Sequence, residues 1–507
     1  MITVIQSLGI SGIEAYPVTI ETFISSGLPG FDVVGLPDAA VRESRERVRA
    51  AMKSCGFGFP SGRITVNLAP ADTKKEGAVY DLPIFLGLLA SAEDGFKVPR
   101  DAVFVGELSL GGELRPMVGA LPMALAVKDA GFKSLFLPLE NASEAAHADG
   151  IEVYGARCVE EIIDHLRGVK RIAPSVAGIP AELESESLDF SDVKGQSAIK
   201  RALEVAAAGG HNILLEGPPG SGKSMLARRL PSILPEMSRE EMFESTKIHS
   251  VAGLLSSRNP VLSSRPFRSP HHTVSVAGLT GGGGRNGALP QPGEFSLAHN
   301  GVLFMDEFPE FNRAALETLR QPLEDGVITL TRASGTVTYP ARFMLVCAMN
   351  PCRCGWLGHP IRECTCTEAQ IAQYRSRLSG PILDRIDMRL TVPSLGYDDL
   401  VSRGGGEKSA DIRSRVERAR QIARDRMREY GVECNAQIPA PLVGEICKPD
   451  EGGAQLIRMA FNKGMTGRSY DRILRLARTI ADLADSEKVL LTHVAEALQY
   501  RGENTAQ

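Results

Sequence analysis

An eight-residue run in the middle of the chain has the residue types and spacing to hold a phosphate group. It satisfies the pattern G-x-x-x-x-G-K-[ST] at every position and reads Gly217-Pro218-Pro219-Gly220-Ser221-Gly222-Lys223-Ser224. The glycines let backbone N–H groups curl around phosphate oxygens, Lys223 adds a positive charge, and the Ser224 hydroxyl can ligate Mg²⁺. The apolar segment 213–215 precedes the loop, and 225–230 can continue as a helix whose N-terminus favours anions. The sequence therefore predicts a site for ATP and Mg²⁺.

Acidic and amide side chains follow two further apolar segments downstream. Asp306 and Glu307 come directly after 301–305, and Asn350 ends the segment 343–349. Ligands of open α/β sheets bind at the carboxyl ends of the strands. We interpret Asp306 as holding Mg²⁺ through its water shell and Glu307 as polarising the attacking water. Asn350 could orient that water or sense the γ-phosphate, or it could simply begin a turn with Pro351.

Arginines could complete such a site, because the transferred phosphate needs positive charge opposite to it. In many ring ATPases a neighbouring subunit supplies this arginine, which is worth about 10³–10⁵ in rate. Our candidate is Arg385, in Leu383-Asp384-Arg385-Ile386-Asp387, with Arg377 in reserve. Arg468, just before the expected helix 470–484, could reach the γ-phosphate from a helical lid, with Arg472 in reserve. Each of these arginines could instead be a solvated surface charge, the commoner fate of the residue type.

Four cysteines form a compact pattern directly after Asn350. Cys352-x-Cys354 and Cys364-x-Cys366 bracket a nine-residue loop. Four thiolates on two short knuckles can surround one Zn²⁺ tetrahedrally, although C-x-C is tighter than the usual C-x₂-C. We predict a structural Zn²⁺ here; free thiols, or His359 replacing one cysteine, are the alternatives.

Basic and histidine-containing segments lie outside the phosphate site. The segments 268–273 and 281–285 separate the phosphate loop from Asp306, and we expect a mobile insertion that faces a pore or a partner. His271 and His272 are adjacent without a third spaced ligand, which is weak evidence for a metal. Three arginines could meet nucleic-acid phosphates: Arg265, Arg268 and Arg285. The arginine-rich stretch 412–430 is either a solvated helix face or a DNA contact.

Three blocks and a linker organise these motifs. We expect an α+β domain at 1–169, a linker at 170–188, an α/β domain with a parallel sheet at 189–395, and a helical domain at 396–507. In the first block 39–54 and 82–92 are predicted helices, and 63–69, 103–110 and 134–137 are predicted strands. The net charge of −4 argues against a protein bound everywhere to nucleic acid. Without a bilayer-length apolar run or a signal peptide, we expect a cytoplasmic protein with no membrane partner.

The second and third blocks resemble AAA+ ATPases of the magnesium-chelatase-like branch. The strings that carry the likeness are 192–196, 268–273, 292–294, 296–299, 303–307, 376–381 and 384–387. The resemblance implies a hexameric ring and places Lys223 and Ser224 on Walker A and Asp306 and Glu307 on Walker B. It also implies that Asn350 is sensor 1, that Arg385 is the arginine finger and that Arg468 is sensor 2.

The whole chain, with the first block included, resembles the ComM/YifB family of bacterial competence proteins. That likeness implies a DNA helicase that promotes branch migration in homologous recombination and natural transformation, with single-stranded or branched DNA as partner. The alternative is the motor subunit of a metal-chelatase complex that inserts Mg²⁺ into a porphyrin. The fused first block and the absence of an evident acidic metal-transfer segment fit that alternative poorly.

The first block resembles the Lon protease domain, a ribosomal S5 domain 2-like fold that uses a Ser–Lys dyad. Val79 stands where that family carries its serine, and 116–121, where the lysine would be, contains none. A valine cannot attack a carbonyl, so we expect no peptidase activity.

Overall fold

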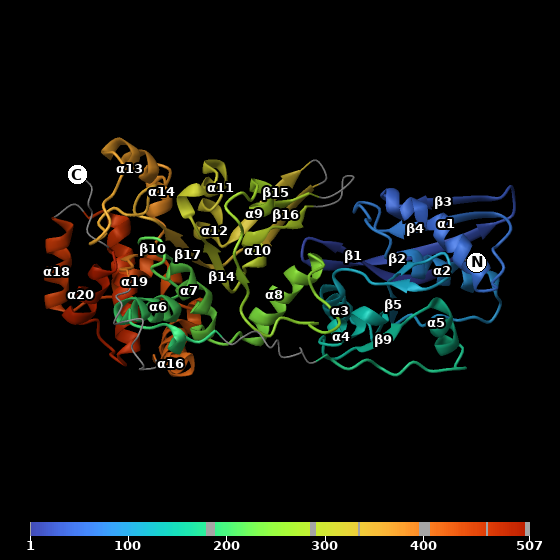
Figure 1. The fold of residues 1–507 in the computed structure, drawn as a ribbon. Coiled ribbons are helices and arrows are strands. Elements are labelled where there is room, and N and C mark those ends of the chain that lie inside the picture. Colours follow the sequence, from blue (N-terminus) through green and yellow to red (C-terminus); the bar gives the residue numbers. More distant parts are fainter. Residues whose placement is uncertain are drawn as a thin grey trace.

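The computed structural model describes residues 2–178, 188–283, 290–332, 335–394, 406–462 and 465–501. Along the molecule, a mixed sheet with its helices is followed by a parallel sheet and then by the C-terminal helices (Figure 1). No helix in these ranges is both long and apolar enough to cross a membrane.

A seven-stranded mixed sheet forms the N-terminal part, in the order β3-β4-β2-β1-β5-β8-β9. The strands are β1 (Ile2–Ser11), β2 (Glu14–Ser25), β3 (Gly30–Val34), β4 (Arg63–Ala69), β5 (Ala102–Phe104), β8 (Ser134–Pro138) and β9 (Glu152–Ala156), with the small ribbon β6 (Glu107–Leu108) and β7 (Leu114–Arg115) beside them. The helices are α1 (Ala39–Ser54), α2 (Asp81–Ala92), α3 (Ala120–Asp129), α4 (Leu139–Ala145) and α5 (Val159–Leu166). Two apolar clusters fill this part, one of them built largely around α2.

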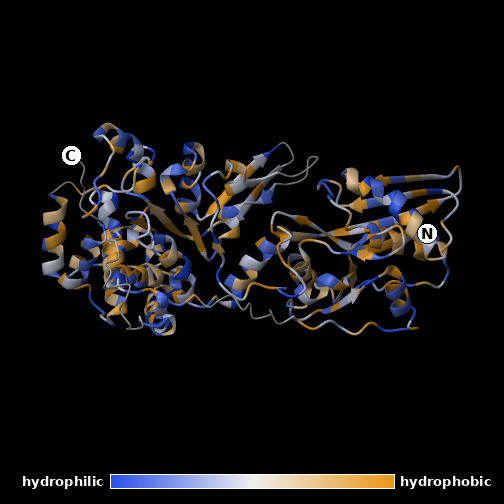
Figure 2. Cartoon of the chain, in the orientation of Figure 1, coloured by the Kyte–Doolittle hydropathy of each residue, from blue (hydrophilic) through white to orange (hydrophobic). Residues whose placement is uncertain are grey.

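A five-stranded parallel sheet forms the centre of the chain, in the order β11-β14-β17-β10-β18. Its strands are β10 (Ile213–Glu216), β11 (Phe267–Arg268), β14 (Val302–Met305), β17 (Met344–Met349) and β18 (Met388–Thr391). Alternate residues of the strands enter different cores: Leu215 and Val346 lie in one, Leu214 and Leu345 in the other. Figure 2 shows these strands as hydrophobic, as expected for a sheet covered on both faces.

Helices cover the two faces of the parallel sheet. Their bounds are α6 (Ser197–Gly209), α7 (Lys223–Arg229), α8 (Arg239–Val251), α9 (Val276–Thr280), α10 (Glu294–Leu297), α11 (Arg313–Glu317), α12 (Arg320–Asp325), α13 (Glu368–Arg375) and α14 (Gly380–Leu383). Two antiparallel pairs complete this part: β12 (Gly281–Gly282) with β13 (Gln291–Pro292), and β15 (Val327–Arg332) with β16 (Gly335–Pro340). Helix α8 packs against α3, and the Ser250 hydroxyl contacts the Glu144 carboxylate there.

The C-terminal helices are α16 (Ser409–Met427), α17 (Ala440–Ile446), α18 (Glu451–Phe461), α19 (Gly467–Leu483) and α20 (Leu491–Gln499). Helix α19 buries an apolar stripe that includes Ile473, Leu476 and Ile480, and this stripe shares one core with α6 and the strands. The helical block is therefore packed against the parallel sheet as one continuous structure.

Four of the arginines of α16 serve this packing. The Arg420 guanidinium donates to the Ala207 carbonyl at 2.6 Å, and Arg415 pairs with Glu204 at 2.5 Å. Arg426 pairs with Asp482 of α19, and Arg413 donates to the Ser232 carbonyl. Neither of the two sequence-based interpretations, a solvated face or a DNA contact, describes these side chains, because they tie α16 to its neighbours.

A largely buried carboxylate joins the sheet to α19. Asp387 accepts a hydrogen bond from the Asn212 backbone N–H at 3.0 Å and pairs with Arg472 at 3.2 Å. Burial opposes its ionisation, but hydrogen bonding to His211 and the charge of Arg472 hold the pKa of Asp387 below its ordinary value. The His211 ring also contacts the Thr479 hydroxyl of α19 at 2.8 Å.

We expect Asp387→Asn to lower the free energy of unfolding by about 2 kcal/mol, because it leaves the Arg472 guanidinium without its counter-charge. Urea unfolding measures this change. The matched control is Asp485→Asn, which removes an exposed ion pair with Arg418 and should cost less than about 0.5 kcal/mol. Equal losses in the two variants would contradict a special role for Asp387.

Candidate active site

The phosphate loop leaves β10 between two neighbouring strands. A Cβ on Gly217 would lie 2.4 Å from the Val392 carbonyl oxygen, so only glycine fits there. The Gly217 N–H donates to the Met349 carbonyl at the end of β17, at 3.1 Å. Gly222 adopts φ +86°, and α7 begins at the next residue. The local structure is therefore the strand, loop and helix that the motif requires.

Lys223 is folded into its own loop. Its amine donates to the carbonyls of Gly217 at 2.6 Å and Pro218 at 2.9 Å, and it lies 3.3 Å from the Asn350 Oδ1. Burial lowers the pKa of this amine. Lys223 follows β10 and Asn350 follows the neighbouring strand β17. The pairing of these two strands therefore brings the two side chains together.

Ser224 and Asp306 are also in direct contact. The Ser224 hydroxyl donates to Asp306 Oδ2 at 2.7 Å, and the Glu307 N–H donates to Asp306 Oδ1 at 3.0 Å. Hydroxyl and carboxylate oxygens are hard donors of the kind that Mg²⁺ prefers. These residues therefore fit a divalent cation placed beside the phosphate loop.

Glu307 has an unusual backbone and an unforeseen partner. Its φ is +53°, a left-handed conformation that is uncommon for residues other than glycine and recurs at functional sites. Its carboxylate lies 3.1 Å from the His272 Nδ1. The sequence assigned the two histidines to a partner-facing insertion and missed this contact, because only the pairing of β11 with β14 brings His272 beside Glu307.

A second missed residue is Gln196, in the turn before α6. It adopts φ +54°, and its amide donates to the Ser221 carbonyl at 2.8 Å. Gln196 thus ties the phosphate loop to the start of α6. The signal available in the sequence was its position in the string 192–196 that carries the family resemblance.

The four candidate arginines do not gather at the phosphate loop of the single chain. Arg385 is buried, donates to the Pro381 carbonyl and pairs with Glu324. Arg377 pairs with Glu310 at 2.6 Å, while Arg472 belongs to the Asp387 cluster. Arg468 is exposed on the first turn of α19.

The arginines proposed for nucleic-acid phosphates are also engaged within the chain. Arg268 makes two hydrogen bonds to Glu294, at 2.6 and 2.7 Å. Arg265 pairs with Glu241 at 2.8 Å and donates to nearby carbonyls. These two are therefore poor candidates for phosphate contacts. Arg285 lies outside the described residues.

The four cysteines converge on one point. The Cys352 sulfur lies 3.3 Å from that of Cys354 and 3.6 Å from that of Cys364, and Cys354 and Cys364 are 3.5 Å apart. The four sulfurs, that of Cys366 included, all lie within 4.8 Å of one another, so they could hold a metal ion. His359 is not a member of this group; its Nδ1 accepts backbone hydrogen bonds from 361 and 362.

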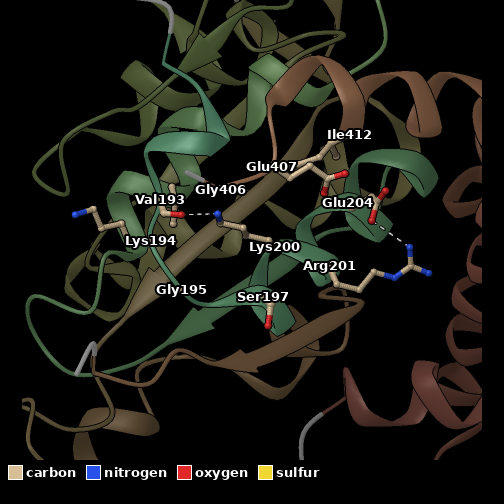
Figure 3. Close-up of a pocket in the computed structure, with 10 residues that line it drawn as sticks. All are labelled: Val193, Lys194, Gly195, Ser197, Lys200, Arg201, Glu204, Gly406, Glu407 and Ile412. Atoms are coloured by element: carbon tan, nitrogen blue, oxygen red, sulfur yellow. Dashed lines mark hydrogen bonds and ion pairs between the residues drawn. The ribbon is translucent and has the colours of Figure 1, made fainter. Parts of the chain in front are cut away.

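A hollow of about 430 Å³ beside α6 is separate from this site. Figure 3 shows two of its charged side chains turned toward partners: the Lys200 amine toward the Val193 carbonyl, and Arg201 toward Glu204, at 3.1 Å. The residues of the phosphate loop are not among those that line it.

Comparison with known proteins covers nearly the whole chain. Residues 189–400 match the model for magnesium chelatase, subunit ChlI, residues 20–141 match that for subunit ChlI of Mg-chelatase, and residues 406–501 match that for its C-terminal part. The competence protein ComM of Haemophilus influenzae is 42% identical in an alignment of 511 positions that covers 99% of this chain and 97% of the relative. This chain belongs to the magnesium-chelatase-like ComM/YifB family.

Two other relatives differ in how much of this ComM/YifB family member they match. The uncharacterised protein YifB of Escherichia coli is 42% identical over 99% of this chain and 97% of the relative. The DNA replication licensing factor Mcm6 of Drosophila melanogaster is 22% identical over 61% of this chain and 36% of the relative. Membership of the ComM/YifB family, with its AAA+-type domain, makes the chain an AAA+ ATPase.

We expect His272→Ala to lower kcat for ATP hydrolysis about tenfold, because Glu307 loses the group that orients its carboxylate. The KM for ATP should change little, since His272 contacts Glu307 and not the phosphate loop. Steady-state ATPase assays measure both constants. His272→Asn keeps a donor and should recover part of the rate; an unchanged kcat in His272→Ala would contradict the positioning role.

Proposed function

We propose that this protein is an ATP-driven DNA motor: a hexameric ring helicase that promotes branch migration in homologous recombination and natural transformation. The proposal of an ATP-driven motor rests on the contact of Ser224 with Asp306, next to Glu307. Ser224 and Asp306 offer a site for a cation, and Glu307 offers a carboxylate for the attacking water. The proposal that DNA is the substrate is supported by the similarity to a competence protein over 99% of the chain.

In this proposal each strand end has one task. The loop N–H groups and Lys223 bind the phosphates, and Ser224 and Asp306 hold Mg²⁺. When bound, Mg²⁺ supplies charge neutralisation at the phosphoryl oxygens. Glu307 accepts a hydrogen bond from the attacking water, and Asn350 fixes the position of that water.

Two arginine roles in the proposal depend on assembly. Arg385 would serve a neighbouring subunit as the arginine finger, which requires that ring contacts release it from Glu324, an exposed residue in the single chain. Arg468 is the proposed lid sensor because it is exposed, whereas Arg472 is committed to Asp387. The nucleotide site is then complete only between two subunits.

We propose the domain limits 1–169, 170–188, 189–395 and 396–507, with a Lon-like first domain that lacks the Ser–Lys dyad. Val79, at the position of the serine, packs against both apolar clusters of that domain. Lys75 is buried nearby, and its amine donates to backbone carbonyls, including that of Thr73 at 2.8 Å. Such a domain would act as a platform and not as a peptidase.

We further propose that Cys352, Cys354, Cys364 and Cys366 bind one structural Zn²⁺. A tetrahedral ion with Zn–S bonds of about 2.3 Å places its sulfurs about 3.8 Å apart. Three sulfur–sulfur separations in the structure, 3.3 to 3.6 Å, are close to that value and far from the bonded distance of a disulfide, about 2.05 Å.

Forked DNA should stimulate ATP hydrolysis by the wild-type protein, and ATP should drive displacement of the labelled strand. Glu307→Gln should bind ATP and DNA but displace no strand, because the attacking water loses its base. Binding should weaken steeply with salt if phosphate contacts drive it. Absence of both stimulation and displacement would contradict the DNA motor, and metallation of an added porphyrin would favour the chelatase alternative.

The protein purified without chelators should contain about one zinc per chain by atomic emission. Cys364→Ser should lose most of this metal, because one thiolate of the four is removed. Cys158→Ser, at a half-buried cysteine outside the cluster, is the control and should retain it. A wild-type protein without zinc would rule out the assignment.

A further inference from the structure

The cysteine cluster is joined to the nucleotide site by a very short stretch of chain. Asn350, which contacts Lys223, is followed by Cys352, Cys354 and Gly355. The Gly355 N–H donates to the Cys352 carbonyl at 3.0 Å, which closes a turn. The Cys354 N–H lies 3.4 Å from the Cys366 sulfur, so the second knuckle holds the same turn.

This turn rests on the phosphate loop itself. Gly355 is buried, has φ +85°, and a Cβ built there would lie 2.6 Å from Pro219 Cδ and 2.7 Å from Pro219 Cγ. Pro219 is the third residue of the phosphate loop and directly precedes Gly220, so its position sets where the following backbone N–H groups of the loop lie. Hydrogen bonds weaken steeply with distance and angle, so a small shift of Pro219 would misplace those donors.

We propose that metal loading of the cysteine cluster sets the affinity of the nucleotide site. With the metal bound, Cys352 and Cys354 are fixed, and the Gly355 backbone holds Pro219 in the conformation that receives phosphate. Without the metal, Cys352 and Cys354 are no longer fixed, and the turn no longer holds the phosphate loop in place. The inference rests on the proposed zinc site and the proposed nucleotide site, and it adds a physical connection between them.

The chain offers a matched pair of variants for the test. Gly358 lies in the same loop with a similar φ of +75°, but it is exposed and a Cβ there would meet nothing within 4 Å. Gly355→Ala and Gly358→Ala therefore share the backbone strain, and only Gly355→Ala presses on Pro219. The probe is a fluorescent ATP analogue titrated in Mg²⁺, with zinc content and far-UV circular dichroism recorded for each sample.

We expect Gly355→Ala to raise the Kd of the analogue about tenfold, which corresponds to about 1.4 kcal/mol. Gly358→Ala should bind like the wild type, and both should keep their zinc. Wild-type protein stripped of zinc by a chelator and then dialysed into Mg²⁺ buffer should show a similar loss, reversed by added Zn²⁺.

Three results would overturn this inference: wild-type affinity in Gly355→Ala, wild-type affinity in the zinc-free protein, or equal losses in Gly355→Ala and Gly358→Ala. If Gly355→Ala does not fold, the stripped and refilled wild type decides the question alone. Failure of the protein to move DNA would remove the motor proposal and leave this result standing, because the readout is ATP binding. Failure of the wild type to bind the analogue would remove both.

Discussion

The parallel pairing of β10, β14 and β17 is the constraint on which the site depends. It sets Leu215 beside Ala348 and Phe304 beside Val346, so three strands end at one edge of the sheet. Only this register places the Ser224 hydroxyl 2.7 Å from Asp306 and the Lys223 amine 3.3 Å from Asn350. Alternate strand residues fill the cores on both faces, and therefore the same burial that stabilises the sheet also aligns the polar groups at its edge.

The other parts of the chain are tied to this edge at identifiable points. Helix α19 reaches the sheet through a shared apolar core and through Asp387, which links it to Asn212 just before β10. Helices α3 and α4 of the N-terminal part meet α8, where Glu144 contacts Ser250. The cysteine turn rests on Pro219. Each connection joins the ATPase part of the chain to another part of the molecule.

Local sequence patterns predicted much of this structure, but they could not predict which residues contact each other from distant parts of the chain. The helix 39–54 and the strand 63–69 have the limits expected from their periodicity. The phosphate loop, Asp306 and Asn350 could be found because each follows an apolar strand directly along the chain. The contact of His272 with Glu307 could not, since it requires knowing that β11 and β14 are neighbours. The carboxylate partners of Arg268 and Arg385, Glu294 and Glu324, are likewise distant in sequence, so local patterns could not predict these pairs.

We propose that the ends of β10, β14 and β17 form the centre that binds and hydrolyses ATP. The most direct test of this proposal measures ATP binding and turnover by Lys223→Ala beside the wild type, at saturating Mg²⁺ and with far-UV circular dichroism to confirm folding. We expect the variant to keep its fold and to lose both ATP affinity and hydrolysis, because the positive charge that binds the phosphates in the proposed mechanism is gone. Hydrolysis at the wild-type rate would show that the centre lies elsewhere in the chain.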